Sequence, residues 1–396
     1  MKAGVLAEPV LVGRERELEE LQSLLNSAAE GKGTTVFISG EAGSGKTRLI
    51  KEFLNTAKEK QDITTLTGSC LSNAAVPYFP FFEAFTIYFS TDSQSAKTRK
   101  EEQEVKSWFL GPAHTNKLGR REAFSPQVWK DQTFIAVTQT LSNISDEKPV
   151  VLFLENIHWA DSASLSLINY MGRVICSKKI LLLATYRNEA LTADAQGHPH
   201  PLVETLRQMR REDLYTEIKL SNLDQSNVSV VAQNMLGGTL QKELEEKLAE
   251  ESRGNPLFVV ESLRMLHERH SLTQENDQWR LSVSELGIPA RIKDIILQRL
   301  SVLERSQRRV LDAASVMGER FHVELLAEVL GQSPLELTET LESIAQATAI
   351  VCCGEELYSF DHAKSREVIY EEISPVLKRG YHAKIAERLE ASSKGE

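Results

Sequence analysis

The most constraining feature of this sequence is a glycine-rich segment between an apolar run and a helical run. Residues 40–47 read Gly-Glu-Ala-Gly-Ser-Gly-Lys-Thr, which matches the pattern G-x-x-x-x-G-K-[ST] at every fixed position. Residues 35–39 before it suit a buried strand, and residues 48–54 after it suit a helix. A strand, a glycine turn and a helix in this order point successive backbone N–H groups at an anion. The segment therefore predicts a phosphate-binding loop in an α/β domain.

The residue types of this loop fit a nucleoside triphosphate. Its glycines let the backbone turn and approach an oligophosphate closely. Lys46 supplies a positive charge for the terminal phosphates, and the Thr47 hydroxyl is placed to ligate a bridging Mg²⁺ ion. The predicted nucleotide contacts in the loop are Gly40, Ala42, Gly43, Ser44, Gly45, Lys46, Thr47 and Arg48.

Length and charge limit the classes of protein to consider. A chain of 396 residues suggests two or three domains, and its net charge of −10 argues against a main role in coating nucleic acid or anionic membranes. The N-terminus lacks the apolar stretch of a secretory peptide, and no apolar run reaches membrane-spanning length, so we expect a cytoplasmic protein. The four cysteines predict neither a disulfide framework nor a zinc site, and we expect the adjacent Cys352 and Cys353 to be core thiols.

Further apolar runs predict the rest of a parallel sheet. A strand is plausible at residues 63–68, and the continuous apolar run at residues 149–156 is typical of a fully buried strand that ends in Glu155. A similar run at residues 179–187 ends in Arg187. The carboxyl ends of parallel strands meet at one edge of a sheet, where the phosphate loop also lies. Strands separated by helical segments therefore predict a doubly wound sheet with charged side chains at the phosphate site.

The second half of the chain reads as helical. After about Leu220 the β-like runs stop, and a Gly-Asn-Pro segment at residues 254–256 marks a helix boundary. Four helices are predicted at residues 290–303, 306–317, 323–330 and 334–345, followed by β-like runs at 349–353 and 356–360. Helices that close with a β-hairpin are typical of a winged helix. We predict a nucleotide-binding domain at 1–220, a helical lid at 221–286 and a winged-helix domain at 287–396.

The order of these motifs resembles the STAND class of AAA-related ATPases, in particular the branch found in large bacterial and archaeal transcriptional regulators and fused to adenylyl cyclases. The likeness covers nearly the whole chain. It implies an AAA-like α/β P-loop NTPase domain, an all-α lid and a winged helix, which clamp ADP at rest, then open and self-associate when ATP replaces it. The residues that carry the likeness are 11–15, 40–47, 155–161, 184–187, 254–258, 360–362 and 382–390.

The resemblance also implies roles for single residues. Arg187 would be the sensor arginine that reaches the γ-phosphate, Pro256 would pack on the base, and His362 would touch the β-phosphate of ADP. Arg366 is a weaker candidate for the region of His362. From the residues alone, Pro256 also reads as a simple helix stop and His362 as a surface histidine. The expected neighbours of the adenine and ribose are Val12, Gly13 and Arg14.

The chain departs from this class at one catalytic position. The class carries two acidic residues at the end of the Walker B strand, which corresponds to residues 149–156 here. The first acidic residue orients the Mg²⁺ shell, and the second polarises the attacking water. The first is Glu155, but the second is Asn156, whose amide cannot accept a proton at neutral pH. General-base help is typically worth about 10²- to 10⁴-fold in rate, so we predict slow ATP hydrolysis. Three explanations stay open: Asn156 traps the ATP state, Asp161 substitutes for the base, or Glu155 does both jobs.

The resemblance implies a signalling switch that uses ADP, ATP and Mg²⁺. Its catalytic site would contain Lys46, Glu155, Asn156 and Arg187, and Thr47 and Glu155 would lie at the metal. Its sensor or effector would lie on a further C-terminal segment or on another chain. The alternative is a DNA-binding ATPase of the origin-recognition type. Residues 291–396 contain 14 Lys and Arg against 18 Asp and Glu, so we do not expect direct DNA binding. A metabolic kinase would leave the motifs at 253–258 and 360–362 unexplained.

Overall fold

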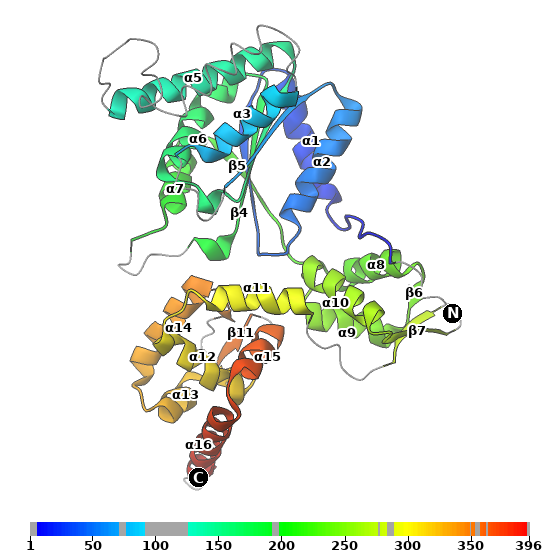
Figure 1. Cartoon of the computed structure of the whole chain (residues 1–396), viewed down its shortest axis with the longest axis vertical. Coiled ribbons are helices and arrows are strands. Elements are labelled where there is room, and N and C mark those ends of the chain that lie inside the picture. The colour runs from blue at the N-terminus through cyan, green and yellow to red at the C-terminus, as the bar shows by residue number, and fades with distance from the viewer. Residues whose placement is uncertain are drawn as a thin grey trace. The chain divides into compact units, whose positions relative to one another are not determined.

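The computed structural model divides the chain into two compact units. One unit is Gly13–Ser221, and the other combines Met1–Val12 with Asn222–Glu396. Figure 1 shows the elements of both. The charge-rich insertion predicted after Thr91 lies outside the described residues. The structure describes residues 6–70, 77–91, 126–191, 198–275, 278–282, 289–348, 350–352, 357–361 and 363–393.

The unit Gly13–Ser221 is built on a five-stranded parallel sheet in the order β2-β3-β4-β1-β5. The four predicted strands were confirmed to within one residue at each end. The fifth strand was not predicted, because only Ile218 in it is buried and it has no apolar run. The strands are β1 (Thr34–Ser39), β2 (Thr64–Ser69), β3 (Val150–Glu155), β4 (Ile180–Tyr186) and β5 (Tyr215–Lys219).

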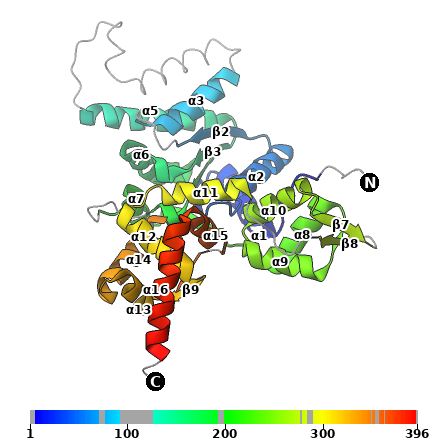
Figure 2. The same cartoon turned by 60° about the horizontal axis from the view of Figure 1, so that its bottom comes forward.

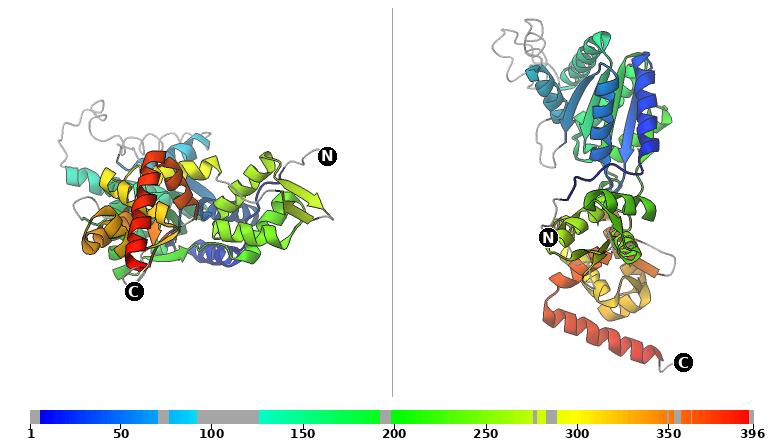
Figure 3. Two further views of the ribbon diagram at one scale, coloured as in Figure 1. Left: turned by 90° about the horizontal axis from the view of Figure 1, so that it is seen from below. Right: turned by 90° about the vertical axis from the view of Figure 1, so that its right-hand side faces the viewer.

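Helices cover both faces of this sheet, which confirms the doubly wound arrangement of a P-loop NTPase (Figure 3). α1 (Glu15–Ala29) and α2 (Lys46–Lys60) lie on one face. The other face carries α3 (Phe79–Thr91), α5 (Pro126–Glu147), α6 (Ser162–Val174) and α7 (Pro201–Arg211).

In the part of the chain that the structure describes, no helix is both long and apolar enough to cross a bilayer.

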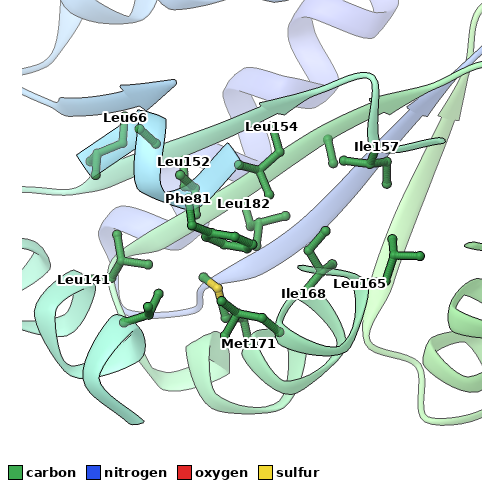
Figure 4. Close-up of a cluster of buried hydrophobic side chains, with 14 of the residues drawn as sticks. Leu66, Phe81, Leu141, Leu152, Leu154, Ile157, Leu165, Ile168, Met171 and Leu182 are labelled. Atoms are coloured by element: carbon green, nitrogen blue, oxygen red, sulfur yellow. The ribbon is translucent and has the colours of Figure 1, made fainter. Parts of the chain in front are cut away.

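Alternating side chains of the central strands form the core beneath α3, α5 and α6. Leu152 and Leu154 of β3 and Leu182 of β4 point to the same face of the sheet and pack with Phe81 and Met171 (Figure 4). All five side chains are fully buried. Burial of each is worth about 1.5–3 kcal/mol, and a one-residue slip would turn the whole set to the opposite face of the sheet. The core therefore fixes the strand register and with it the positions of the strand ends.

The first part of the other unit combines helices with a small sheet (Figure 2). The prediction of an all-α lid was wrong here, because three short strands pair in the order β6-β8-β7. These strands are short and largely polar, so they have no apolar run; Trp279 anchors them by donating to the Leu236 carbonyl at 3.1 Å. The elements are α8 (Gln225–Leu236), β6 (Thr239–Leu240), α9 (Lys242–Ser252), α10 (Pro256–Glu268), β7 (Leu272–Glu275) and β8 (Gln278–Leu281).

The last part of this unit has helices around a three-stranded antiparallel sheet in the order β10-β11-β9, which is consistent with a winged helix. The predicted helices and hairpin were confirmed, and β9 was missed because it has only three residues. Cys352 is exposed, so its expected place in the core was wrong; Cys353 lies outside the described residues. The elements are α11 (Ala290–Leu300), α12 (Arg305–Met317), β9 (Arg320–His322), α13 (Val323–Leu330), α14 (Pro334–Thr348), β10 (Val351–Cys352), β11 (Leu357–Phe360), α15 (Ala363–Glu372) and α16 (Pro375–Ser393).

Candidate nucleotide-binding site

The glycine-rich loop joins the end of β1 to the start of α2, and its backbone requires glycine. Gly40, Gly43 and Gly45 have φ angles of 156°, 84° and 95°, which side chains disfavour. At Gly40 a Cβ atom would also lie 2.8 Å from Ser44 Oγ and 2.9 Å from the Leu220 carbonyl oxygen. The loop is therefore built so that its backbone amides, followed by the N-terminus of α2, curve around an anion.

The Lys46 ammonium is held against the inside of this loop. The residue is only 7% exposed, and its Nζ donates to the carbonyls of Gly40 and Glu41 at 2.7 Å each. A buried charge is costly unless it is hydrogen-bonded, and these bonds offset that cost. Lys46 therefore places a positive charge at the phosphate loop. Arg48, the other predicted cationic contact, is exposed on α2.

Thr47 and Glu155 meet at the edge of the sheet. The Thr47 hydroxyl donates to Glu155 Oε1 at 2.5 Å, which joins the start of α2 to the end of β3. Mg²⁺ prefers oxygen ligands and commonly uses one or two protein groups together with phosphates and water. Among the described residues, no cluster of three or more His, Cys, Asp or Glu side chains is placed to hold a metal. A hydroxyl and one carboxylate fit the protein's share of a magnesium–nucleotide site.

The backbone conformation at residue 156 favours asparagine over glutamate. Its φ and ψ of 59° and 45° are left-handed, a conformation that Asn tolerates better than Glu. Its backbone N–H donates to the Thr185 hydroxyl at 3.0 Å, which links the ends of β3 and β4. The turn after β3 therefore accepts Asn, as it would accept Asp, and the amide leaves this position without a carboxylate.

Asp161 does not provide the missing base. Its Oδ1 accepts the N–H groups of Ala163 and Ser164 at 2.9 Å each, which caps α6. Its Oδ2 accepts from the Tyr78 N–H at 3.2 Å and from the Ser164 hydroxyl. Because four donors occupy the two oxygens, the explanation that Asp161 replaces the base is not supported by the geometry.

Arg187 directly follows β4, the strand that lies between β1 and β3. Its guanidinium lies 5.5 Å from the centroid of the Trp159 ring. Trp159 is 37% exposed and offers a ring face to this cation. Sheet order thus brings the phosphate loop, Glu155 and Arg187 to one edge.

His158 is a buried histidine beside these charges that sequence reasoning had not singled out. It is 3% exposed, and neither ring nitrogen has a hydrogen-bond partner within the described residues. Burial lowers its pKa to about 3, with further lowering by the charges of Arg187, Lys46 and His200. His158 is therefore neutral at physiological pH and adds no charge to the site.

His158 predicts a specific loss of stability in acid. The unfolded chain binds a proton as pH falls below 6.5, whereas the folded chain resists protonation until about pH 3. Stability is thus lost across that window by about 1.4 kcal/mol per pH unit. We expect the free energy of unfolding to fall between about pH 7 and about pH 5 by about 2 kcal/mol less in His158→Leu than in wild type. Urea unfolding followed by circular dichroism at the two pH values measures this difference. Equal losses in both proteins would contradict the assignment.

Arg14 contacts the backbone of the phosphate loop. It is 4% exposed, pairs with Glu17 at 3.2 Å and donates to the carbonyls of Ser221 and, at 3.5 Å, Ser44. The neighbouring Gly13 has a left-handed φ of 66°, which glycine adopts more readily than other residues. Both were predicted to border the adenine and ribose; in the structure Arg14 stabilises the loop.

The other predicted contacts belong to the second unit. Val12 packs against the hydrophobic cluster of α8, α9 and α10. Pro256 is the first residue of α10, after the N-cap Asn255, whose side chain accepts the Leu257 N–H at 3.1 Å. Pro256 thus begins a helix and does not stop one. His362 lies outside the described residues.

Glu189 is a second residue at the site that was missed. It lies in the short helix η4 (Asn188–Ala190) after β4, and its Oε1 accepts the backbone N–H of Ala42 at 2.7 Å. Thr185, which accepts the Asn156 N–H, was also missed. Thr185 belongs to the 184–187 motif but was given no role, and no motif includes Glu189. Both reach the site only through the pairing of β4 with β1 and β3.

Residues 10–183 match the family described as the AAA ATPase domain. The match includes the phosphate loop, Glu155 and most of the parallel sheet. Together with the geometry above, this similarity supports an AAA-type P-loop NTPase domain over the matched residues, a kind of domain that binds nucleotide, usually with Mg²⁺.

The chain is similar to an uncharacterised protein of Rhizobium meliloti, with 25% identity over 389 residues that cover 92% of this chain and 35% of that protein. The chain thus spans about a third of this relative. A Walker-type ATPase of Pyrococcus abyssi shares the fold, with a TM-score of 0.57, 13% identity and coverage of 91% and 96% of the two chains. A signal transduction ATPase with numerous domains from Pyrococcus horikoshii has 16% identity and a TM-score of 0.38, with coverage of 98% of this chain and 46% of that chain.

Proposed function

We propose that this chain is a signal-transduction ATPase switch of the STAND type. It would bind ADP or ATP with Mg²⁺ at the phosphate loop, hydrolyse ATP slowly, and self-associate in the ATP state. The sensor or effector would lie on a further segment or on another chain. A ligand shifts such an equilibrium only if it binds the two states unequally. The observation that carries the proposal is the way the segment around His362 is fastened to the Gly-Asn-Pro motif.

Arg253 makes the first part of this fastening. The residue precedes that motif and has a left-handed φ of 47°. Its guanidinium donates to the Phe360 carbonyl at 3.1 Å and to the Asp361 carbonyl, and it pairs with Glu319. The Arg253 side chain therefore binds the backbone carbonyls of Phe360 and Asp361, the two residues immediately before His362.

Lys364 makes the second part, two residues after His362. It is 5% exposed and pairs with Glu251 of α9 at 2.9 Å. Asp361 is fixed in addition by Arg299 at 3.0 Å. Ion pairs with this little solvent exposure are costly to break by removing one partner. These bonds support a lid and winged helix that move as one body, so that contacts of Pro256 and His362 with nucleotide would change together.

Arg366, the weaker candidate, has a different role. Its Nε donates to the Ser315 carbonyl at 2.9 Å, and its guanidinium lies 5.5 Å from the centroid of the Tyr370 ring. These contacts commit Arg366 to packing within the winged helix. His362 therefore stands as the proposed phosphate contact in this segment.

The test combines two measurements on the full chain. The purified protein is denatured, the released nucleotide is identified by chromatography, and the oligomeric mass is measured by light scattering with ADP and with ATP. We expect ADP to be retained by a monomer and ATP to produce a larger assembly. A protein that purifies without nucleotide and keeps one mass under both conditions would contradict the switch.

The same measurements predict the effect of Arg253→Ala. Loss of its charged hydrogen bonds, worth about 1.5–3 kcal/mol each, should free the segment around His362 and weaken ADP retention by about tenfold or more. Arg269→Ala, on the exposed surface after α10, is the matched control and should behave as wild type. Equal ADP retention in both variants would show that the fastening does not contribute to nucleotide binding.

One observation favours the alternative of direct DNA binding. Arg305, Arg308, Arg309 and Lys384 line a cavity of about 680 Å³ next to α16. Phosphate contacts would make binding fall steeply with salt. Because Asp312 lies among these cations and pairs with Arg308 at 3.0 Å, we still expect no duplex binding at physiological salt. Fluorescence anisotropy with a labelled duplex tests this.

A further inference from the structure

A group that positions water and receives its proton would speed the hydrolysis proposed above by about 10²- to 10⁴-fold. Asn156 cannot accept that proton, and both oxygens of Asp161 are engaged in capping α6. Glu155 accepts from Thr47 and lies where a metal ligand is needed. Glu189 therefore has to be compared with the remaining carboxylates near this edge of the sheet.

Two other carboxylates of this unit are committed to contacts between structural elements. Glu217 on β5 accepts from the Ser39 hydroxyl at 2.9 Å and the Tyr186 hydroxyl at 2.6 Å. Glu83 on α3 accepts the Ser69 N–H at 2.5 Å. Both bonds lie between structural elements and serve to hold them together.

Glu189 differs because its partner is the phosphate loop itself. Its Oε1 is 2.7 Å from the backbone nitrogen of Ala42, four residues before Lys46, and Ala42 is 7% exposed. Glu189 also follows Arg187 by two residues, in the short helix η4 that comes after the strand between β1 and β3. The carboxylate is thus anchored beside the loop that cradles the phosphates and on the element that carries the proposed sensor of the γ-phosphate.

We propose that Glu189 is the catalytic carboxylate for ATP hydrolysis in this chain, the role that Asn156 leaves open. This inference rests on the proposed ATPase function. As the water oxygen bonds to the γ-phosphorus, the bond from that phosphorus to the β,γ-bridging oxygen breaks and its electron pair leaves on ADP. Glu189 accepts one water proton and then releases it to solvent. ATP and water thus become ADP, phosphate and a proton.

The test is Glu189→Gln in the full chain. The amide keeps an oxygen that accepts the Ala42 N–H, so the loop should be preserved while the base is lost. In single-turnover assays we expect hydrolysis to fall by about 10²-fold, with affinity for a fluorescent ATP analogue within about threefold of wild type. Glu204→Gln on α7 is the control and should match wild type in both measurements. A Glu189→Gln rate within about threefold of wild type would overturn the proposal.

Two further variants make the result specific. Glu189→Ala removes the acceptor, so hydrogen exchange at the Ala42 amide should be faster than in wild type and Glu189→Gln; unchanged exchange would show that the contact is absent and overturn the proposal. Asn156→Asp keeps a residue that tolerates left-handed φ, and we expect its rate to lie within about threefold of wild type. A 10²-fold gain that persists in Asn156→Asp with Glu189→Gln would place the base at residue 156 and overturn the proposal.

Failure of this inference is separable from failure of the proposed function. Wild-type protein that neither binds nor hydrolyses ATP would remove the ATPase function itself. Wild-type hydrolysis that survives Glu189→Gln would reject only the assignment of Glu189.

Discussion

Replacing Lys46 by glutamine is expected to weaken ATP binding by about two to three orders of magnitude. The ammonium lies inside the phosphate loop with 7% exposure, held by the Gly40 and Glu41 carbonyls. Charge-assisted hydrogen bonds to the terminal phosphates are worth about 1.5–3 kcal/mol each, and glutamine supplies no charge. Isothermal titration calorimetry with ATP and Mg²⁺ measures this loss directly.

The matched control is Lys51→Gln, five residues further along α2 and exposed to solvent. It removes the same charge from the same helix, so any loss of general electrostatic attraction appears there as well. Comparable affinities in Lys46→Gln and Lys51→Gln would contradict the assignment of the loop as the phosphate site.

Replacing Glu155 by glutamine is expected to remove most Mg²⁺-dependent hydrolysis, by about 10³-fold. The amide oxygen keeps the acceptor for the Thr47 hydroxyl, which lies 2.5 Å from Glu155 Oε1, so the connection of α2 to β3 should survive. The negative charge that holds the cation is lost, and a metal's electrostatic stabilisation of phosphoryl transfer is worth several kcal/mol, or about 10³-fold. Phosphate release at increasing Mg²⁺ concentrations gives both the rate and the metal dependence.

Glu59→Gln, at an exposed position of α2, is the control for the loss of one carboxylate. We expect its Mg²⁺ dependence to match wild type, whereas Glu155→Gln should need far more Mg²⁺ at any measurable rate. Unaltered Mg²⁺ dependence in Glu155→Gln would show that the cation is held by other groups.

The parts of the fold that were predictable are those whose side chains are buried on both faces or on one helical stripe. β3 and β4 are continuous apolar runs because helices cover both sides of the sheet, and the loop before α2 has glycines where the backbone requires them. β5, β9 and the strands β6 to β8 were missed because they are short or half exposed, so they carry polar residues and no run. Their pairing depends on partners distant in sequence.

The site divides in the same way. Lys46, Thr47, Glu155 and Arg187 were predictable because each follows directly from a loop pattern or from the end of an apolar strand. His158 and Glu189 were not, because their significance arises from burial beside other charges and from a contact between residues 42 and 189. No local pattern encodes such a contact.

The sequence by itself determined that this chain has a phosphate loop at the edge of a parallel sheet, because backbone geometry and strand burial restrict residue choice at each position. Only the tertiary structure decided which groups surround each carboxylate. It commits Asp161 to a helix cap and gives Asn156 a left-handed turn, and it brings Glu189 to Ala42. The physical reason is that a carboxylate's chemistry depends on the donors that surround it, and sheet pairing between distant segments supplies those donors.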